Sequence, residues 1–262
     1  SIKSHFLICD FWKKMYFNDV HILYYVLFIL VGGIIGQFID YTSKCFIKER
    51  KIFTKESFSK YKKTMLPNYI LILGIAIAYT GLLYKFGLHS GFKENLDLIK
   101  YVILIPMLAC AFYVDLKEQI IPNRLNLLIF EIGLVLVFIY GFININISLN
   151  LLLGMLAGGG IFLVITLIGG LIAGKEAMGM GDVKLMGALG LFFGLQNIIV
   201  ISVLAFLIGA IVSIVIMIIK RKGTDTYIPF GPFIVISSVI TIFVPFSILF
   251  TILMKIFTLG MY

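Results

Sequence analysis

Charged side chains are scarce in this sequence. Only 13% of its 262 residues are Asp, Glu, Lys or Arg, whereas 61% are hydrophobic and the mean hydropathy is +1.08. A soluble globular domain carries about 25% charged residues, so an ordinary soluble fold is excluded. The composition predicts an all-α fold, that of a polytopic helical integral membrane protein. The formal charge of +9 does not predict a nucleic-acid partner, because Lys and Arg gather in the cytoplasmic loops of membrane proteins.

Cysteines are also few, and no two of them form a Cys-x-x-Cys pair. The three are Cys9, Cys45 and Cys110. Such wide spacing indicates neither a structural zinc site nor a disulfide framework. The sequence also contains no Walker-type phosphate-binding loop and no cluster of metal ligands. The residues therefore give no reason to expect a metal or a nucleotide.

Long apolar runs fill most of the chain. A hydrocarbon core of about 30 Å needs roughly 20 apolar residues to cross it, and the runs predict about eight transmembrane helices. Their ranges are 21–38, 67–88, 98–114, 125–143, 149–173, 182–195, 197–219, and a last one from 228 that bends or breaks at Pro245. A short polar, basic segment, residues 39–66, follows the first of them.

The distribution of Lys and Arg sets the orientation. Loops 39–66, 115–124, 174–184 and 220–228 hold eight, two, two and three of the 22 cations. The positive-inside rule places these four loops in the cytoplasm. Segment 39–66 is then a topology anchor on anionic headgroups, or a segment that also helps to bind substrate. All three histidines fall on the opposite side, which argues against a Ser-His triad. Asp115 and Asp182 fall on the cytoplasmic side together.

These two aspartates are the candidate catalytic groups. Asp115 ends the third apolar run, and Asp182 opens the sixth directly after Gly179-Met180-Gly181. A carboxylate at the edge of hydrocarbon is costly, which marks it as a functional candidate. Two neighbouring carboxylates share a proton, so one can activate a water while the other protonates a carbonyl oxygen. Taken singly, each aspartate is also compatible with an ordinary place at a helix end.

Three motifs together resemble the type IV prepilin peptidases, membrane aspartic proteases of the Gly-x-Gly-Asp class. The first is Asp115 followed by Ile-Pro-Asn-Arg-Leu at residues 121–125. The second is Gly-Met-Gly-Asp-Val-Lys at 179–184, and the third is Pro-Phe-Gly-Pro-Phe at 229–233. The resemblance covers roughly residues 100–245. It implies a peptidase domain at 67–262, preceded by a reduced counterpart of the family's N-terminal domain at 1–66.

The resemblance also implies an activity and a location. Members cleave short basic leaders from prepilins or pseudopilins at the cytoplasmic face of the bacterial inner membrane, so prepilins and membrane lipid are the expected partners. Asp115 and Asp182 carry over as the catalytic pair, with no cofactor for proteolysis. Further residues expected to bind substrate or support the pair are Gly179, Gly181, Lys184, Pro122, Asn123, Glu131, Pro229 and Gly231. Glu131 is alternatively a hydrogen-bonded residue between helices.

The N-terminal part departs from the family pattern. Many members carry two Cys-x-x-Cys pairs in a domain linked to S-adenosylmethionine-dependent methylation of the new N-terminus, and this sequence lacks them. Methyl transfer, with S-adenosylmethionine as its cofactor, is therefore only a second expectation.

Two other functions are also compatible with the sequence. A presenilin-like or signal-peptide-peptidase-like protease shares Gly-x-Gly-Asp, but there the first aspartate follows tyrosine directly, whereas Val114 intervenes here, and the Pro-Ala-Leu motif is absent. A proton-coupled transporter would use Asp115, Asp182 and Glu131 as a relay. Transporters often contain internal repeats, and none is visible here.

Overall fold

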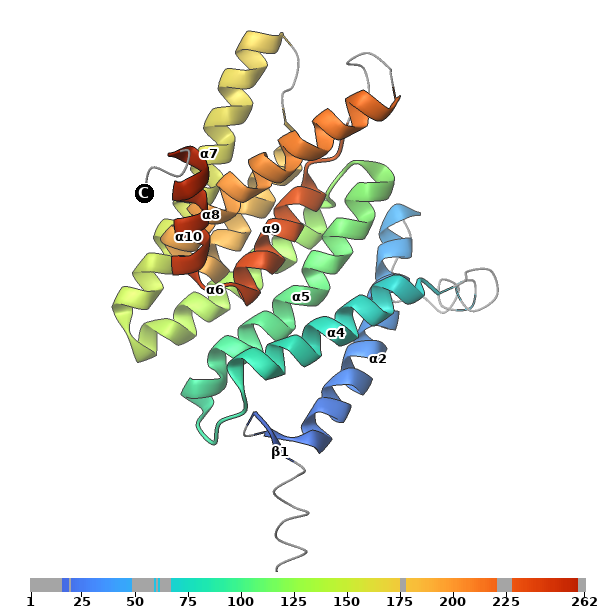
Figure 1. Ribbon diagram of the computed structural model, residues 1–262, viewed down its shortest axis with the longest axis vertical. Coiled ribbons are helices and arrows are strands. Elements are labelled where there is room, and N and C mark those ends of the chain that lie inside the picture. The colour runs from blue at the N-terminus through green and yellow to red at the C-terminus, as the bar shows by residue number, and fades with distance from the viewer. Residues whose placement is uncertain are drawn as a thin grey trace, which may run out of the picture. The chain divides into compact units, whose positions relative to one another are not determined.

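The protein is mainly helical in the part of the chain that the computed structural model describes (Figure 1). Those residues are 16–18, 20–48, 59, 61, 67–174, 178–220 and 228–258. Most of the predicted basic segment, and the first 15 residues of the expected N-terminal part, lie outside them. The only strands in the described ranges are β1 (Tyr16–Phe17) and β2 (Val20–His21), which pair antiparallel.

Six helices among the described residues are long and apolar enough to cross a membrane. They are α2 (Ile22–Ile47), α4 (Tyr69–Phe86), α5 (Phe92–Glu118), α6 (Asn123–Ile143), α7 (Ile145–Ala173) and α8 (Met180–Lys220). Two shorter apolar helices follow, α9 (Gly231–Phe243) and α10 (Phe246–Phe257). The prediction of an all-α, polytopic membrane protein is confirmed.

The chain divides into two compact units, the first formed by residues 1–42 and 53–106. In this unit α2 and α4 approach closely at two glycines. A methyl group on Gly32 would lie 2.8 Å from Ala76 Cα, and one on Gly36 would lie 2.8 Å from Ile72 Cα. Small residues allow such backbone contact between membrane helices. The Tyr79 hydroxyl, buried on α4, donates a hydrogen bond to the Val102 carbonyl of α5 (2.7 Å).

The second unit, residues 43–52 and 107–262, is built around the packing of α7 against α8. A methyl group on Gly158 of α7 would lie 2.5 Å from Met186 O and 2.8 Å from Ile198 Cγ1. A straight helix would hold those two residues roughly 18 Å apart, so α8 must reverse between them. Gly194 makes the reversal with φ 73° and ψ 176°, a conformation that favours glycine.

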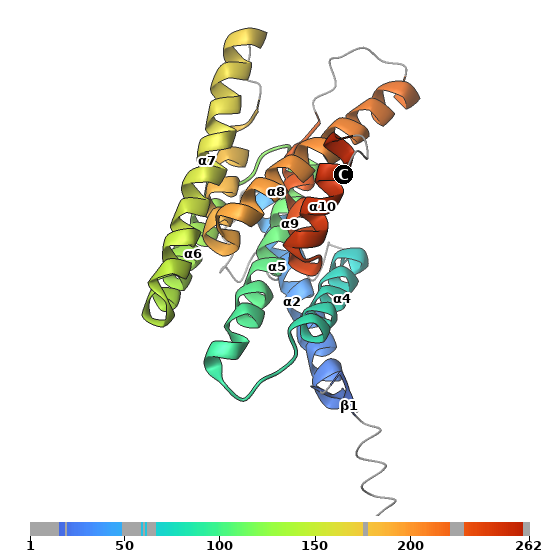
Figure 2. The ribbon, with the colours of Figure 1, turned by 60° about the vertical axis from the view of Figure 1, so that its left-hand side comes forward.

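The two predicted runs 182–195 and 197–219 are therefore the two arms of α8, which run in different directions in Figure 2. Asn150 of α7 stabilises the turn, because its side-chain oxygen accepts a hydrogen bond from the Leu195 N–H (3.3 Å). The small residues of α7 allow this close approach at Gly154 and Gly158, whereas no atom of the described residues lies within 4 Å of a methyl group placed on Gly160.

The last predicted run breaks at Pro245, as expected. Proline has no N–H to continue a helix, and Pro245 stands between the end of α9 and the start of α10. The start of α9 is fixed by an aromatic cluster. The Phe230 ring packs on Phe162 of α7 and Phe206 of α8, with centroid distances of 5.9 and 5.1 Å. This packing positions the Pro-Phe-Gly-Pro motif beside α5.

Candidate active site

Asp115 lies in the last turn of α5, where the helix ends. Gln119 follows that end with φ 56°, and its N–H donates to the Asp115 carbonyl (2.9 Å). A left-handed residue directly after a helix is a common way to terminate it. The Asp115 side chain is only 4% exposed. The chain thus turns away and leaves the carboxyl group buried at the helix end.

Gly231 binds the Asp115 carboxyl directly. Its N–H donates to Asp115 Oδ2 at 3.0 Å, a contact between residues 116 positions apart. A methyl group on Gly231 would lie 2.5 Å from the same oxygen, so glycine is required for this approach. Backbone N–H donors stabilise negative charge on a carboxylate. The predicted Pro-Phe-Gly-Pro motif therefore contributes a main-chain donor to the site.

Asp182 lies in the first turn of α8, as predicted, and its side chain is 6% exposed. Its N–H donates to the Gly179 carbonyl (3.0 Å), which closes the turn that starts the helix. Among the described residues, Asp182 Oδ1 has no hydrogen-bond partner. A buried carboxyl oxygen without a partner is costly, which marks Asp182 as a candidate functional residue.

Both aspartates line one cavity of about 290 Å³, and they lie close enough for their charges to interact. The lining residues are Asp115, Gln119, Ile120, Ile121, Asn123, Gly179, Met180, Gly181, Asp182 and Lys184. The buried side chain of Ile121 lies between Gly181, which precedes Asp182, and Gly231, which contacts Asp115. Its side chain would meet a methyl group on Gly181 at 3.3 Å and one on Gly231 at 3.1 Å. The prediction that the two aspartates lie on one side of the protein agrees with this cavity.

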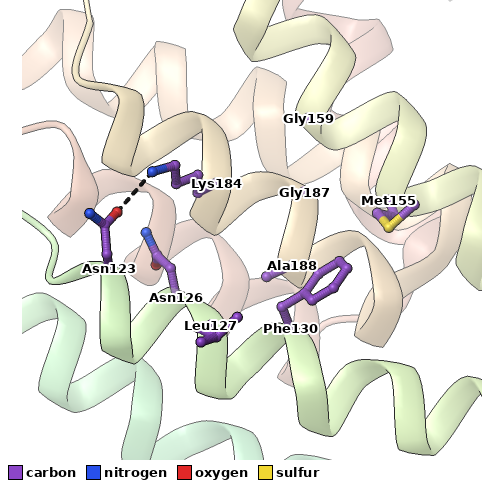
Figure 3. Close-up of a pocket in the computed structure, with 9 residues that line it drawn as sticks. All are labelled: Asn123, Asn126, Leu127, Phe130, Met155, Gly159, Lys184, Gly187 and Ala188. Atoms are coloured by element: carbon purple, nitrogen blue, oxygen red, sulfur yellow. Dashed lines mark hydrogen bonds between the residues drawn. The ribbon is translucent and has the colours of Figure 1, made fainter.

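Most of the other predicted residues surround the pair. Gly179, Gly181, Asn123 and Lys184 line the cavity, and the Lys184 ammonium donates to Asn123 Oδ1 at 2.9 Å (Figure 3). Pro122 is the N-cap of α6, and its carbonyl accepts hydrogen bonds from the first turn of that helix. Pro229 is half-buried just before the Phe230 anchor. Glu131 is exposed on α6 and is not among the lining residues.

Asn126 is a residue that the sequence reasoning missed. It is 3% exposed, and its Nδ2 donates to the Gly181 carbonyl at 2.9 Å. This hydrogen bond connects α6 to the glycine turn that precedes Asp182. A signal was present in the sequence, because a polar side chain inside an apolar run usually faces the protein interior and finds a partner there. Gln119 and Ile121 were also missed, and neither carries a chemical signal of its own.

The arrangement fits acid–base chemistry on a bound water. Two buried carboxyls in one cavity cannot both ionise cheaply, so they hold one proton between them. One carboxylate can then remove a proton from water while the other carboxyl donates to an oxygen that develops charge.

Comparison with known proteins places these residues in a family context. Residues 102–214, which include both aspartates, match the type IV leader peptidase family. The chain is similar to a prepilin leader peptidase/N-methyltransferase of Legionella pneumophila, with 34% identity over 59% of this chain and 52% of that protein. The same name belongs to similar proteins of Escherichia coli K12 (33% identity, 49% and 56% coverage) and Aeromonas hydrophila (29%, 52% and 46%). The chain thus spans about half the length of the curated relatives it matches. No solved structure matches it.

Proposed function

We propose that the chain is a membrane aspartic endopeptidase of the type IV leader peptidase family, which residues 102–214 match. It removes the short basic leader from type IV prepilins or pseudopilins. The observation that carries the proposal is the common cavity of Asp115 and Asp182. These residues come from different helices, both are buried, and both lie in the matched region.

The reaction uses water held between the two carboxyl groups. The ionised carboxylate takes a proton from this water, whose oxygen attacks the carbonyl carbon of the scissile peptide. The protonated carboxyl gives its proton to the carbonyl oxygen, which yields a neutral tetrahedral gem-diol. The carbon–nitrogen bond then breaks as the nitrogen receives a proton from the carboxyl that first acted as base, while one hydroxyl of the gem-diol gives its proton to the other carboxylate, which restores both groups to their starting states. Proteolysis by this route consumes one water and no cofactor.

Asp115 and Asp182 occupy different surroundings within the cavity. The Gly231 N–H supports negative charge on Asp115 Oδ2, whereas Asp182 Oδ1 has no partner in the described part of the chain. We assign the Gly231 N–H to holding the Asp115 carboxyl in place. We assign Asp182 Oδ1 to binding the reacting water. Preorganised donors of this kind cost no reorganisation during the reaction.

The active site faces the cytoplasm of the bacterial inner membrane in this proposal. The support is the distribution of Lys and Arg, with 15 of the 22 in the four loops assigned to that side, eight, two, two and three in order. A basic leader stays in the compartment where it is made, so the cut occurs there as well. Methylation of the new N-terminus would be a separate activity.

Co-expression with a prepilin tests the proposal. The intact mass of the prepilin is measured beside wild-type enzyme, Asp115→Asn, Asp182→Asn and a control, Glu94→Gln. Glu94 is an exposed carboxylate at the opposite end of α5 from Asp115. We expect leader loss with wild type and Glu94→Gln, and an uncut prepilin with either Asn variant. Cleavage that persists in both Asn variants would overturn the proposal. The same spectrum shows whether a methyl group has been added.

A further inference from the structure

Pro106 interrupts the hydrogen bonding of α5 inside the helix. In a regular helix the N–H of each residue donates to the carbonyl four residues earlier. Proline has no N–H, so the Val102 carbonyl is left without the donor that position 106 would otherwise supply. A carbonyl without a donor is costly in a membrane-spanning helix, because hydrocarbon offers no replacement. This carbonyl therefore needs a donor from a neighbouring helix.

Tyr79 of α4 supplies the missing donor. Its hydroxyl donates to the Val102 carbonyl oxygen at 2.7 Å, and this is the same oxygen that Pro106 leaves free. The Tyr79 side chain is 1% exposed, and its ring packs against Phe28 of α2 with the two ring centroids 6.4 Å apart. Burial and this ring contact hold the hydroxyl in place beside α5. The hydrogen bond that proline removes from α5 is thus replaced by one from α4.

The interruption lies where α5 passes from one compact unit to the other. Pro106 is the last residue of the first unit, and Met107 begins the main part of the second. Tyr79 and Val102 belong to the first unit, whereas Asp115 belongs to the second. At 1.5 Å per residue, Pro106 lies roughly 14 Å along the helix from Asp115. Because proline is a usual cause of sharp helix kinks, α5 bends most easily between these two segments.

We propose that Tyr79, Val102 and Pro106 form a joint in α5, which the hydrogen bond from the Tyr79 hydroxyl holds closed. While this bond is made, the two halves of α5 keep one orientation. When it opens, the Val102 carbonyl has no donor in its own helix, and the half that carries Asp115 bends at Pro106 independently of the half bound to α4. The joint is a conformational device in the helix that carries one of the two aspartates, and it does not depend on the proposed peptidase function.

A double-mutant cycle on the full chain in detergent tests the joint by the midpoint of thermal unfolding. Tyr79→Phe removes the donor, and we expect the midpoint to fall by at least about 2–4 °C. Pro106→Ala supplies an N–H for the same carbonyl, so in that background Tyr79→Phe should lower the midpoint much less. The control, Tyr69→Phe, removes a hydroxyl from a 66% exposed side chain at the start of α4 and should leave the midpoint unchanged. Equal losses from Tyr79→Phe in the two backgrounds would overturn the proposal.

Hydrogen–deuterium exchange locates the motion and does not require the alanine variant to fold. Peptides that cover residues 103–112 of α5 are compared in wild type, Tyr79→Phe and Tyr69→Phe. Opening of the joint breaks helix hydrogen bonds beside Pro106, so we expect Tyr79→Phe to speed exchange there about tenfold. Exchange in residues 182–195 of α8 should stay unchanged, as should all exchange in Tyr69→Phe. Exchange at the wild-type rate across the joint, or faster to the same extent throughout the chain, would overturn the proposal.

Discussion

Replacement of Gly231 by alanine perturbs the site by one methyl group. This methyl would lie 2.5 Å from Asp115 Oδ2 and 3.1 Å from Ile121 Cδ1. Ordinary contact begins near 3.4 Å, so the carboxyl must move by about 0.9 Å. The hydrogen bond from the Gly231 N–H to that oxygen, now 3.0 Å, is then lost or stretched. The change leaves both aspartates in the sequence but displaces one of them.

A displacement of about 1 Å in a catalytic group costs roughly 100-fold in rate. We therefore expect Gly231→Ala to lower kcat/KM for prepilin cleavage about 100-fold. The assay is initial-rate cleavage by purified enzyme in detergent, followed on gels that separate the precursor from the processed pilin. Thermal unfolding of the same samples separates a displaced carboxyl from a misfolded protein.

Gly160→Ala is the matched control for this experiment. Gly160 lies within α7 in the same unit, and no atom in the described part of the chain lies within 4 Å of the added methyl. Alanine in the interior of a helix is favoured over glycine by about 1 kcal/mol, so the control should be at least as stable as wild type and equally active. A Gly231→Ala enzyme with wild-type kcat/KM would refute the role given to this N–H and to the geometry around it.

Three further changes test single contacts, each by the midpoint of unfolding in detergent. Asn126→Leu leaves the part-buried Gly181 carbonyl without its donor and should cost about 1–3 kcal/mol; an unchanged midpoint would contradict this bond. Gly194→Ala forces a side chain into a backbone conformation with φ 73° and should cost about 1–3 kcal/mol, a result that a straight α8 would not give. Tyr61→Phe removes a hydrogen bond of 2.7 Å to the buried Asp40, worth about 1 kcal/mol. Burial first, and then this bond, raises the pKa of Tyr61 above its usual value of 10.0, so the difference from wild type should be full below pH 10.0 and disappear as the phenol ionises at higher pH.

The sequence was sufficient for the fold class and for the position of the two aspartates at helix ends. The length of an apolar run shows directly whether it can cross a membrane. A carboxylate at the edge of such a run is costly, which marks it as a functional candidate. The Gly-x-Gly turn before Asp182 and the break at Pro245 could also be predicted from the sequence, because glycine and proline act through their own backbone geometry.

Contacts between segments that are distant in the chain could not be predicted from the sequence. The hydrogen bond from Gly231 to Asp115 joins residues 116 positions apart, and it depends on how Phe230 packs between α7 and α8. Helix neighbours are set by packing, which hydropathy does not encode. For the same reason the hydrogen bond from Asn126 to the Gly181 carbonyl was not foreseen, since it joins α6 to α8.

Glu131 illustrates a limit of another kind. A carboxylate inside an apolar run predicts a functional or hydrogen-bonded residue, because a charge in hydrocarbon is costly. The sequence does not show which face of the helix carries it. The structure places Glu131 on an exposed face of α6, whereas Asn126, five residues earlier on the same helix, is buried against the glycine turn.

A double-mutant comparison tests the central claim, that Asp115 and Asp182 act as one catalytic unit. Single-turnover cleavage of a prepilin is measured with Asp115→Asn, Asp182→Asn and the enzyme that carries both changes. Residues that act as a unit give strongly non-additive losses. We predict that each single change lowers the rate by roughly 1,000-fold or more and that the double variant is no slower than either. A double variant slowed by the product of the two single effects, or a single variant within about tenfold of wild type, would contradict the account.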